Sequence, residues 1–307
     1  MPTTNIPIAY VSPFIPREWV AAHGCTPIRV TARAARGTTF DGQGVCYFCH
    51  SLAESMMQVE EAAAVVMATT CDQMRRMAER LSTELSKPVF LMNVPATWRT
   101  ETARTIYRDE LRRLGDFLVE LGGRRPSVDE FVAAANACGQ RADDLLYSRG
   151  GNFNSAESRG DSIPILLLGS PDLREHEELV ECIRQAGGHV EVDGREGVER
   201  TYPLSIDKVL AEQDPIEAMV DAYFDQIPGA FRRPNDALYT WVEQVVKTRG
   251  ICGAIVGHYV SCDPWHAESH RLKERLDIPC LVLDYDECPD ISERAKGRIH
   301  AFMETLR

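Results

Sequence analysis

Continuous apolar runs alternate along this chain with stretches in which apolar residues recur at helical spacing. Short apolar runs such as 63–68 and 163–168 are typical of strands buried on both faces of a sheet, and the stretches between them are typical of amphipathic helices. The expected strands are 6–11, 28–31, 63–68, 88–93, 163–168, 189–192, 252–259 and 280–284. The expected helices are 16–23, 51–60, 72–85, 100–121, 128–147, 173–186, 215–224, 235–248, 265–276 and a terminal helix. Such alternation predicts parallel sheets covered by helices.

One segment interrupts the alternation near the middle of the chain. Residues Ser148–Ser162 read SRGGNFNSAESRGDS, a small, polar and glycine-containing composition that is typical of a domain boundary. We therefore predict an α/β protein of two domains, residues 1–155 and residues 156–307. Each is expected to be a parallel sheet flanked by helices, doubly wound in the Rossmann or flavodoxin manner.

Composition narrows the function classes. The 307 residues are 44% hydrophobic and 26% charged, with a formal net charge of −12 and a pI of about 5.2. This balance argues against a nucleic-acid surface. The first residues show neither a basic region nor a long apolar core of a signal peptide, and the apolar runs are too short to cross a bilayer. The expected location is the cytoplasm, with no membrane partner.

The chain contains ten cysteines. In the absence of a secretion signal they are not expected to form a disulfide framework. Four lie at apolar positions of expected helices or strands, where free cysteine acts as a small buried hydrophobe, and two have the surroundings of turn residues. The first group is Cys138, Cys182, Cys252 and Cys280; the second is Cys25 and Cys288. The candidates left for chemistry are Cys46, Cys49, Cys71 and Cys262.

Three of these candidates, Cys46, Cys71 and Cys262, stand where a strand gives way to a helix. Ligands of open α/β proteins gather at the carboxyl ends of the strands, so these thiols are expected to converge at one edge. Cys71 and Cys262 each precede an aspartate that could cap the following helix. A thiolate at a helix start is stabilised by free backbone N–H groups, and thiolates in a reducing compartment hold iron–sulfur clusters or zinc.

Two other chemistries use similar cysteines. Cys46 and Cys49 form a C-x-x-C pair, and Cys262 stands four residues before His266, which stands four before His270, so a zinc site is conceivable. A thioredoxin-type redox pair would require a strand directly before the C-x-x-C, but a polar stretch precedes it. The P-loop, H-E-x-x-H, G-x-S-x-G and dinucleotide-binding patterns are absent from the sequence.

The strings around the candidate cysteines resemble those of a known family. CYFCHSL, TTCDQMRR followed by the strand-like PVFLMNVP, and HYVSCDPWHAESHRLKERLDIPCLVLDYD are similar to segments of the subunits of 2-hydroxyacyl-CoA dehydratases and ATP-dependent benzoyl-CoA reductases. The resemblance covers nearly the whole chain. Residue by residue, it assigns the cluster ligands to Cys46, Cys71 and Cys262. Phe48 favours Cys46 over Cys49, and that alternative stays open.

What the resemblance implies is a [4Fe-4S] cluster held by three cysteines, with one iron left open for chemistry. It further implies a second homologous subunit or a homodimer, an acyl-CoA substrate, and a separate activator ATPase with its own iron–sulfur cluster that supplies low-potential electrons. The expected enzyme is an anaerobic lyase, or an oxidoreductase acting on acyl-CoA or benzoyl-CoA. A related branch with two linked cubanes reduces small molecules. The resemblance assigns no catalytic residue beyond the ligands.

Overall fold

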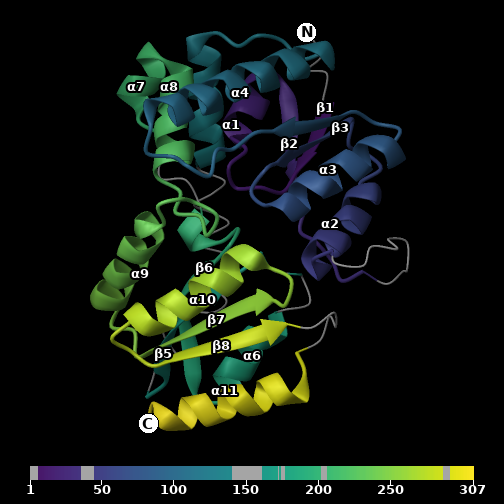
Figure 1. Ribbon diagram of the computed structural model, residues 1–307. Coiled ribbons are helices and arrows are strands. Elements are labelled where there is room, and N and C mark those ends of the chain that lie inside the picture. Colours follow the sequence, from purple (N-terminus) through teal and green to yellow (C-terminus); the bar gives the residue numbers. More distant parts are fainter. Residues whose placement is uncertain are drawn as a thin grey trace.

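A computed structural model of the chain describes residues 6–35, 45–139, 161–171, 173, 177–201, 206–285 and 291–307. Two parallel sheets of four strands each organise these residues (Figure 1), which confirms the predicted α/β class. The first sheet consists of β1 (Ile6–Tyr10), β2 (Cys25–Arg29), β3 (Ala64–Ala68) and β4 (Val89–Met92) in the spatial order β2-β1-β3-β4. The second consists of β5 (Ile163–Gly169), β6 (Gly188–Arg195), β7 (Gly253–Tyr259) and β8 (Cys280–Tyr285) in the order β6-β5-β7-β8.

The two sheets have the same topology. In each, the first strand of the half lies between the second and the third, and the fourth pairs with the third. All six pairings are parallel. This order places the carboxyl ends of all four strands of a sheet at one edge, which is where open α/β sheets bind ligands.

Helices cover both faces of each sheet because alternate side chains of a strand point to opposite faces. Ile8 and Val66 face one core with helix α4 (Glu101–Glu120), whereas Ala9 and Val65 face another core. That second core is filled by α2 (Tyr47–Met57) and α3 (Asp72–Glu84). The second sheet lies between the pair α6 (Glu177–Gln185) and α11 (Glu293–Thr305) and the pair α9 (Asp236–Arg249) and α10 (Asp263–Arg275).

The first core also receives a segment from the second half of the chain. Helices α7 (Lys208–Gln213) and α8 (Pro215–Met219) and the π-helical turn Val220–Asp225 lie beside α4 and α1 (Arg17–Ala22) in Figure 1. Buried residues of this segment belong to the core that contains β1 and β3. The chain therefore returns to the first sheet before it builds α9 and β7.

The domain limits at residue 155 remain a prediction. Most of the expected linker Ser148–Ser162, like the last part of the expected helix 128–147, lies outside the described residues. Residues 128–139 of that helix are helical as expected.

Several element boundaries differ from the sequence-based expectation for physical reasons. Strand β2 begins at Cys25, three residues before the expected start, and it contains Pro27. An edge strand tolerates proline because one side of its backbone has no strand partner, and β2 is an edge strand of its sheet. Cys25 is therefore a buried strand residue and not a turn residue, and Cys252, expected to be buried, is exposed. Cys288 lies outside the described residues.

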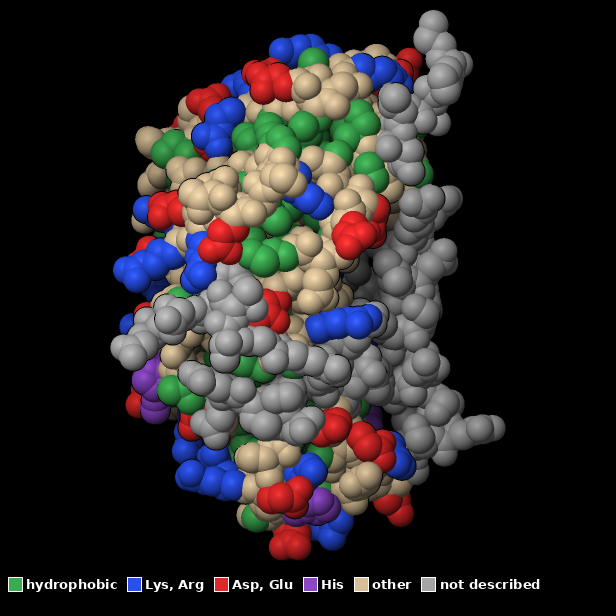
Figure 2. Space-filling model, turned by 90° about the vertical axis from the view of Figure 1, so that its right-hand side faces the viewer, with side chains coloured by type: hydrophobic (Ala, Val, Ile, Leu, Met, Phe, Trp, Pro, Cys, Tyr) green, Lys and Arg blue, Asp and Glu red, His purple; other side chains and the backbone are tan. Residues whose placement is uncertain are grey.

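The surface of the described residues mixes charges of both signs. On the face shown in Figure 2, acidic and basic side chains alternate over short distances, with hydrophobic side chains between them. No helix within the described ranges is long and apolar enough to span a bilayer.

Candidate iron–sulfur site

The three cysteines chosen from the sequence are all N-cap residues of helices. Cys46 precedes α2, Cys71 precedes α3 and Cys262 precedes α10. The expected start of the first of these helices, Ser51, was wrong: α2 begins at Tyr47, and Ser51 lies inside it with its hydroxyl accepting a hydrogen bond from the backbone of Ala35. Cysteine is not a common capping residue, so Cys46 did not mark the start of this helix in the sequence.

Cys71 and Cys262 occupy equivalent places in the two sheets. Cys71 stands three residues after the end of β3, and Cys262 three residues after the end of β7. Because β3 and β7 are the corresponding strands of the two sheets, the two Cys-Asp strings form the same strand–turn–helix unit. The aspartates are the first helical residues and not the caps, since the Cys71 sulfur itself accepts a hydrogen bond from the Met74 N–H at 3.4 Å.

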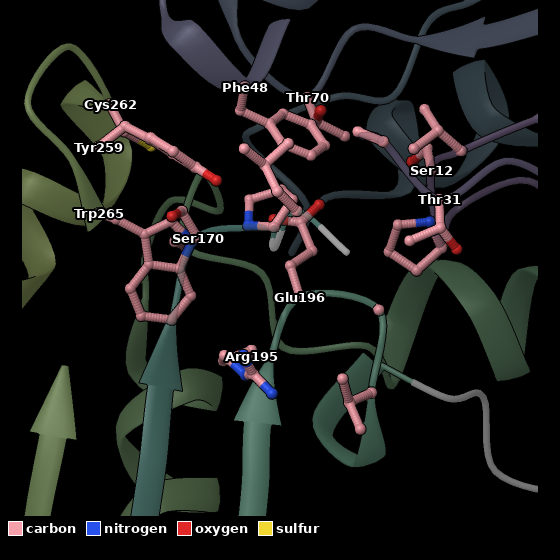
Figure 3. Close-up of a pocket in the computed structure, with 18 of the residues that line it drawn as sticks. Ser12, Thr31, Phe48, Thr70, Ser170, Arg195, Glu196, Tyr259, Cys262 and Trp265 are labelled. Atoms are coloured by element: carbon pink, nitrogen blue, oxygen red, sulfur yellow. The ribbon is translucent and has the colours of Figure 1, made fainter. Parts of the chain in front are cut away.

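The three sulfur-bearing residues line a single cavity of about 480 Å³ between the carboxyl edges of the two sheets. Cys46 and Cys71 enter it from the first half and Cys262 from the second. Aromatic side chains close the space around them: Tyr259 packs with its ring 6.1 Å from that of Phe48, and Trp265 is fully buried. Figure 3 shows Phe48, Tyr259, Cys262 and Trp265 around this cavity.

The fourth candidate, Cys49, lies between two of these cysteines. Its side chain is 2% exposed and lies against the thiols of both Cys46 and Cys71. These contacts lower the pKa of Cys46 and of Cys71, whereas the same contacts and burial raise the pKa of Cys49. Burial also raises the pKa of Cys262. Of the four candidate cysteines, Cys46 and Cys71 are therefore the two whose surroundings favour the thiolate form.

The histidines of the zinc hypothesis do not join this cavity. The rings of His258, His266 and His270 stack edge to face outside it, and His258 and His266 line a second pocket with Asp284. Cys262 and His266 therefore face different pockets. Within the described parts of the chain, no three His, Cys, Asp or Glu side chains are grouped to hold one metal ion. A polynuclear cluster needs no such grouping, because each cysteine binds a different iron.

The cavity is also lined by residues that the sequence reasoning did not select for a site. Ser170 follows β5, Glu196 follows β6, and Trp265 lies in the first turn of α10. The strand-end rule that found Cys262 would have found Ser170 and Glu196 as well, but neither belongs to a recognisable motif. Arg200, close to Glu196 along the chain, is a buried residue whose guanidinium donates to the carbonyls of Gly194 and Pro228.

Comparison with known proteins identifies the family. Residues 13–148 and 141–306 match the profile of the family described as 2-hydroxyglutaryl-CoA dehydratase, D-component. The chain belongs to this family and is a dehydratase-type subunit, which confirms the resemblance drawn from the cysteine strings. The putative dehydratase subunit YjiM of Escherichia coli (strain K12) is 25% identical over 290 residues, covering 79% of this chain and 74% of that protein.

Solved structures resemble the chain only distantly. The periplasmic zinc binding protein TroA from Treponema pallidum has 9% identity and a TM-score of 0.29, over 98% of this chain and 96% of that one. Fe(III)-bound YtgA from Chlamydia trachomatis has 8% identity and a TM-score of 0.26, also over 98% and 96%. Nothing about this chain follows from similarities this low.

Proposed function

We propose that this chain is the iron–sulfur subunit of an enzyme of the 2-hydroxyacyl-CoA dehydratase type, with Cys46, Cys71 and Cys262 as the ligands of a [4Fe-4S] cluster. The observation that supports this most is the meeting of three helix N-terminal cysteines, from both halves of the chain, at one cavity. Family membership supports the same chemistry. Thiolates are the usual ligands of such clusters.

The surroundings of the cysteines suit a cluster. Each N-terminus presents free backbone N–H groups and the positive end of a helix dipole to the space in which the negative cluster would lie. When bound, the cluster supplies strongly reducing electrons to the thioester carbonyl of an acyl-CoA. The chain itself excludes water with the rings of Phe48, Tyr259 and Trp265, and it holds the three sulfurs at the ends of rigid helices.

The partners belong to the same proposal. A second homologous subunit, or a second copy of this chain, would complete the enzyme. A separate activator ATPase with its own cluster would deliver the electrons, since the sequence carries no P-loop. The proposed location is the cytoplasm, where thiols stay reduced.

Metal analysis of the protein purified without oxygen tests the proposal. We expect about four irons and four acid-labile sulfides per chain, with broad visible absorbance. About eight irons would instead indicate the branch with two linked cubanes. One zinc per chain without sulfide would overturn the iron–sulfur assignment. For protein that contains iron and sulfide, an activity assay with an activator ATPase separates the two enzyme classes. Dehydration of a 2-hydroxyacyl-CoA would indicate a lyase, and reduction of an acyl-CoA would indicate a reductase.

The choice between Cys46 and Cys49 can be tested with a matched pair of variants. We expect Cys46→Ala to lose most of the iron and Cys49→Ala to retain it, because Cys46 shares the N-cap position of the other two ligands and Cys49 does not. Cys49 is one helical turn deeper, with its sulfur 3.7 Å from that of Met74. Iron and sulfide assays of both proteins provide the measurement, and the reverse pattern would assign the ligand to Cys49.

A further inference from the structure

A group of polar side chains faces the cysteines from the second half of the chain. Ser170, Glu196 and Trp265 follow β5, β6 and β7, which are neighbours in the sheet order β6-β5-β7. All three line the same cavity as Cys46, Cys71 and Cys262. In Figure 3, Ser170 lies beside the indole of Trp265, and Glu196 extends into the cavity near them.

The backbone fixes two of these residues at the sheet edge. The Ser170 N–H donates to the carbonyl of Gly257 at 3.0 Å, and the Glu196 N–H donates to the carbonyl of Gly169 at 3.3 Å. Residues on such a bonded edge are more precisely placed than residues on a free loop. These bonds therefore hold Ser170 and Glu196 in place at the edge of the cavity.

Two of the three have polar atoms that are buried without a full hydrogen bond. Ser170 is 2% exposed, and its hydroxyl oxygen has no partner among the described residues. Trp265 is 1% exposed, and its indole N–H, which lies near the Glu196 carboxyl, has no hydrogen-bond partner among the described residues. Buried polar groups in native proteins are almost always bonded, so both atoms indicate a missing polar partner inside the cavity.

The chemistry of the group selects the kind of partner. Burial raises the pKa of the Glu196 carboxyl, although Arg200 and Arg29 lie near it and act in the opposite direction. The guanidinium of Arg29 donates to the carbonyl of Gly197 at 2.9 Å. A second carboxylate would be repelled by an ionised Glu196. A hydroxyl group can accept from the serine and the indole and can also donate to the carboxyl, so it satisfies all three.

We propose that Ser170, Glu196 and Trp265 form a subsite that recognises the hydroxyl group of a hydroxylated acyl substrate, opposite the three cysteines. This deepens the proposed function and rests on it, because it places the hydroxylated end of an acyl-CoA in the cavity that the cysteines share. Phe48 and Tyr259 supply the apolar walls for the rest of the acyl chain.

Binding to matched pairs of thioesters tests the subsite. The probes are 2-hydroxyglutaryl-CoA against glutaryl-CoA, and 2-hydroxy-4-methylpentanoyl-CoA against 4-methylpentanoyl-CoA, each titrated into anaerobically purified protein by calorimetry. For at least one pair, we expect the hydroxylated thioester to bind about tenfold more tightly than its partner, which corresponds to one or two net hydrogen bonds.

The variants locate the discrimination. In Ser170→Ala, whose hydroxyl makes no bond within the described protein, we expect the affinity for the hydroxylated thioester to fall about fivefold and that for its partner to stay unchanged. Glu196→Gln is expected to reduce the same preference. Ser269→Ala is the matched control, because Ser269 is a fully buried serine outside the cavity whose hydroxyl donates to the carbonyl of His266.

The outcomes separate this inference from the proposed function. Equal affinity within both pairs, binding of none of the thioesters, or an equal loss of affinity for both members of a pair in Ser170→Ala would overturn the subsite. Iron and sulfide contents are measured on the same samples. A protein with a full cluster but no preference for the hydroxyl would refute the subsite alone, whereas a protein that binds no iron would refute the proposed function.

Discussion

Cys262→Ala, purified without oxygen, should contain almost no iron or acid-labile sulfide, although Cys46 and Cys71 both remain in the other half of the chain. The reason is that a cube held by three protein thiolates has no spare ligand: two anchors leave two irons open, and the cluster is lost to solvent or chelators. Cys262 enters the shared cavity from the second sheet, whereas Cys46 and Cys71 enter it from the first.

A control separates loss of the ligand from general damage. Cys252 is exposed and lies outside the cavity, so Cys252→Ala should keep the iron and sulfide content of the unmodified protein. Circular dichroism of both variants checks that each is folded. If Cys262→Ala retained its full iron content, the second half of the chain would not contribute a ligand, and the site would have to be built from the first half alone.

The cysteine strings could be interpreted from the sequence because a strand, a short turn and a helix start are local features. TTCDQM and VSCDPW predict the same unit, and the structure places both at corresponding strands. Sequence reasoning also gave the class of the fold, since buried parallel strands have continuous apolar runs. The use of these cysteines as cluster ligands stays a prediction.

Other features depended on contacts between distant residues. Nothing local in α7 and α8 indicates that they pack into the core around β1 and β3, because an amphipathic helix can cover either sheet. Ser170 and Glu196 stand in ordinary loop strings, GSPDL and GREGV. Their significance comes from the sheet order, which brings the ends of β5 and β6 together, and the sequence does not contain that order.

Gly169→Ala should destabilise the protein strongly and disturb the cavity at the same time. Gly169 ends β5 with a φ of +147°, and a Cβ atom there would lie 1.9 Å from the carbonyl oxygen of Gly257 on the neighbouring strand. The neighbour is backbone, so it cannot rotate away. Backbone strain and overpacking together should lower the free energy of unfolding by on the order of 3 kcal/mol or more.

The matched control is a second glycine-to-alanine substitution that is expected to stabilise the protein. Gly297 is exposed within α11, and a Cβ atom there would meet nothing within 4 Å. Gly297→Ala should therefore raise the free energy of unfolding by about 0.5–1 kcal/mol, because alanine is the better helix former. Urea unfolding of the three proteins gives both values. Equal stability of Gly169→Ala and the unmodified protein would mean that β5 and β7 do not approach each other this closely, and Ser170 would then lose its bond to Gly257 as its anchor at the cavity.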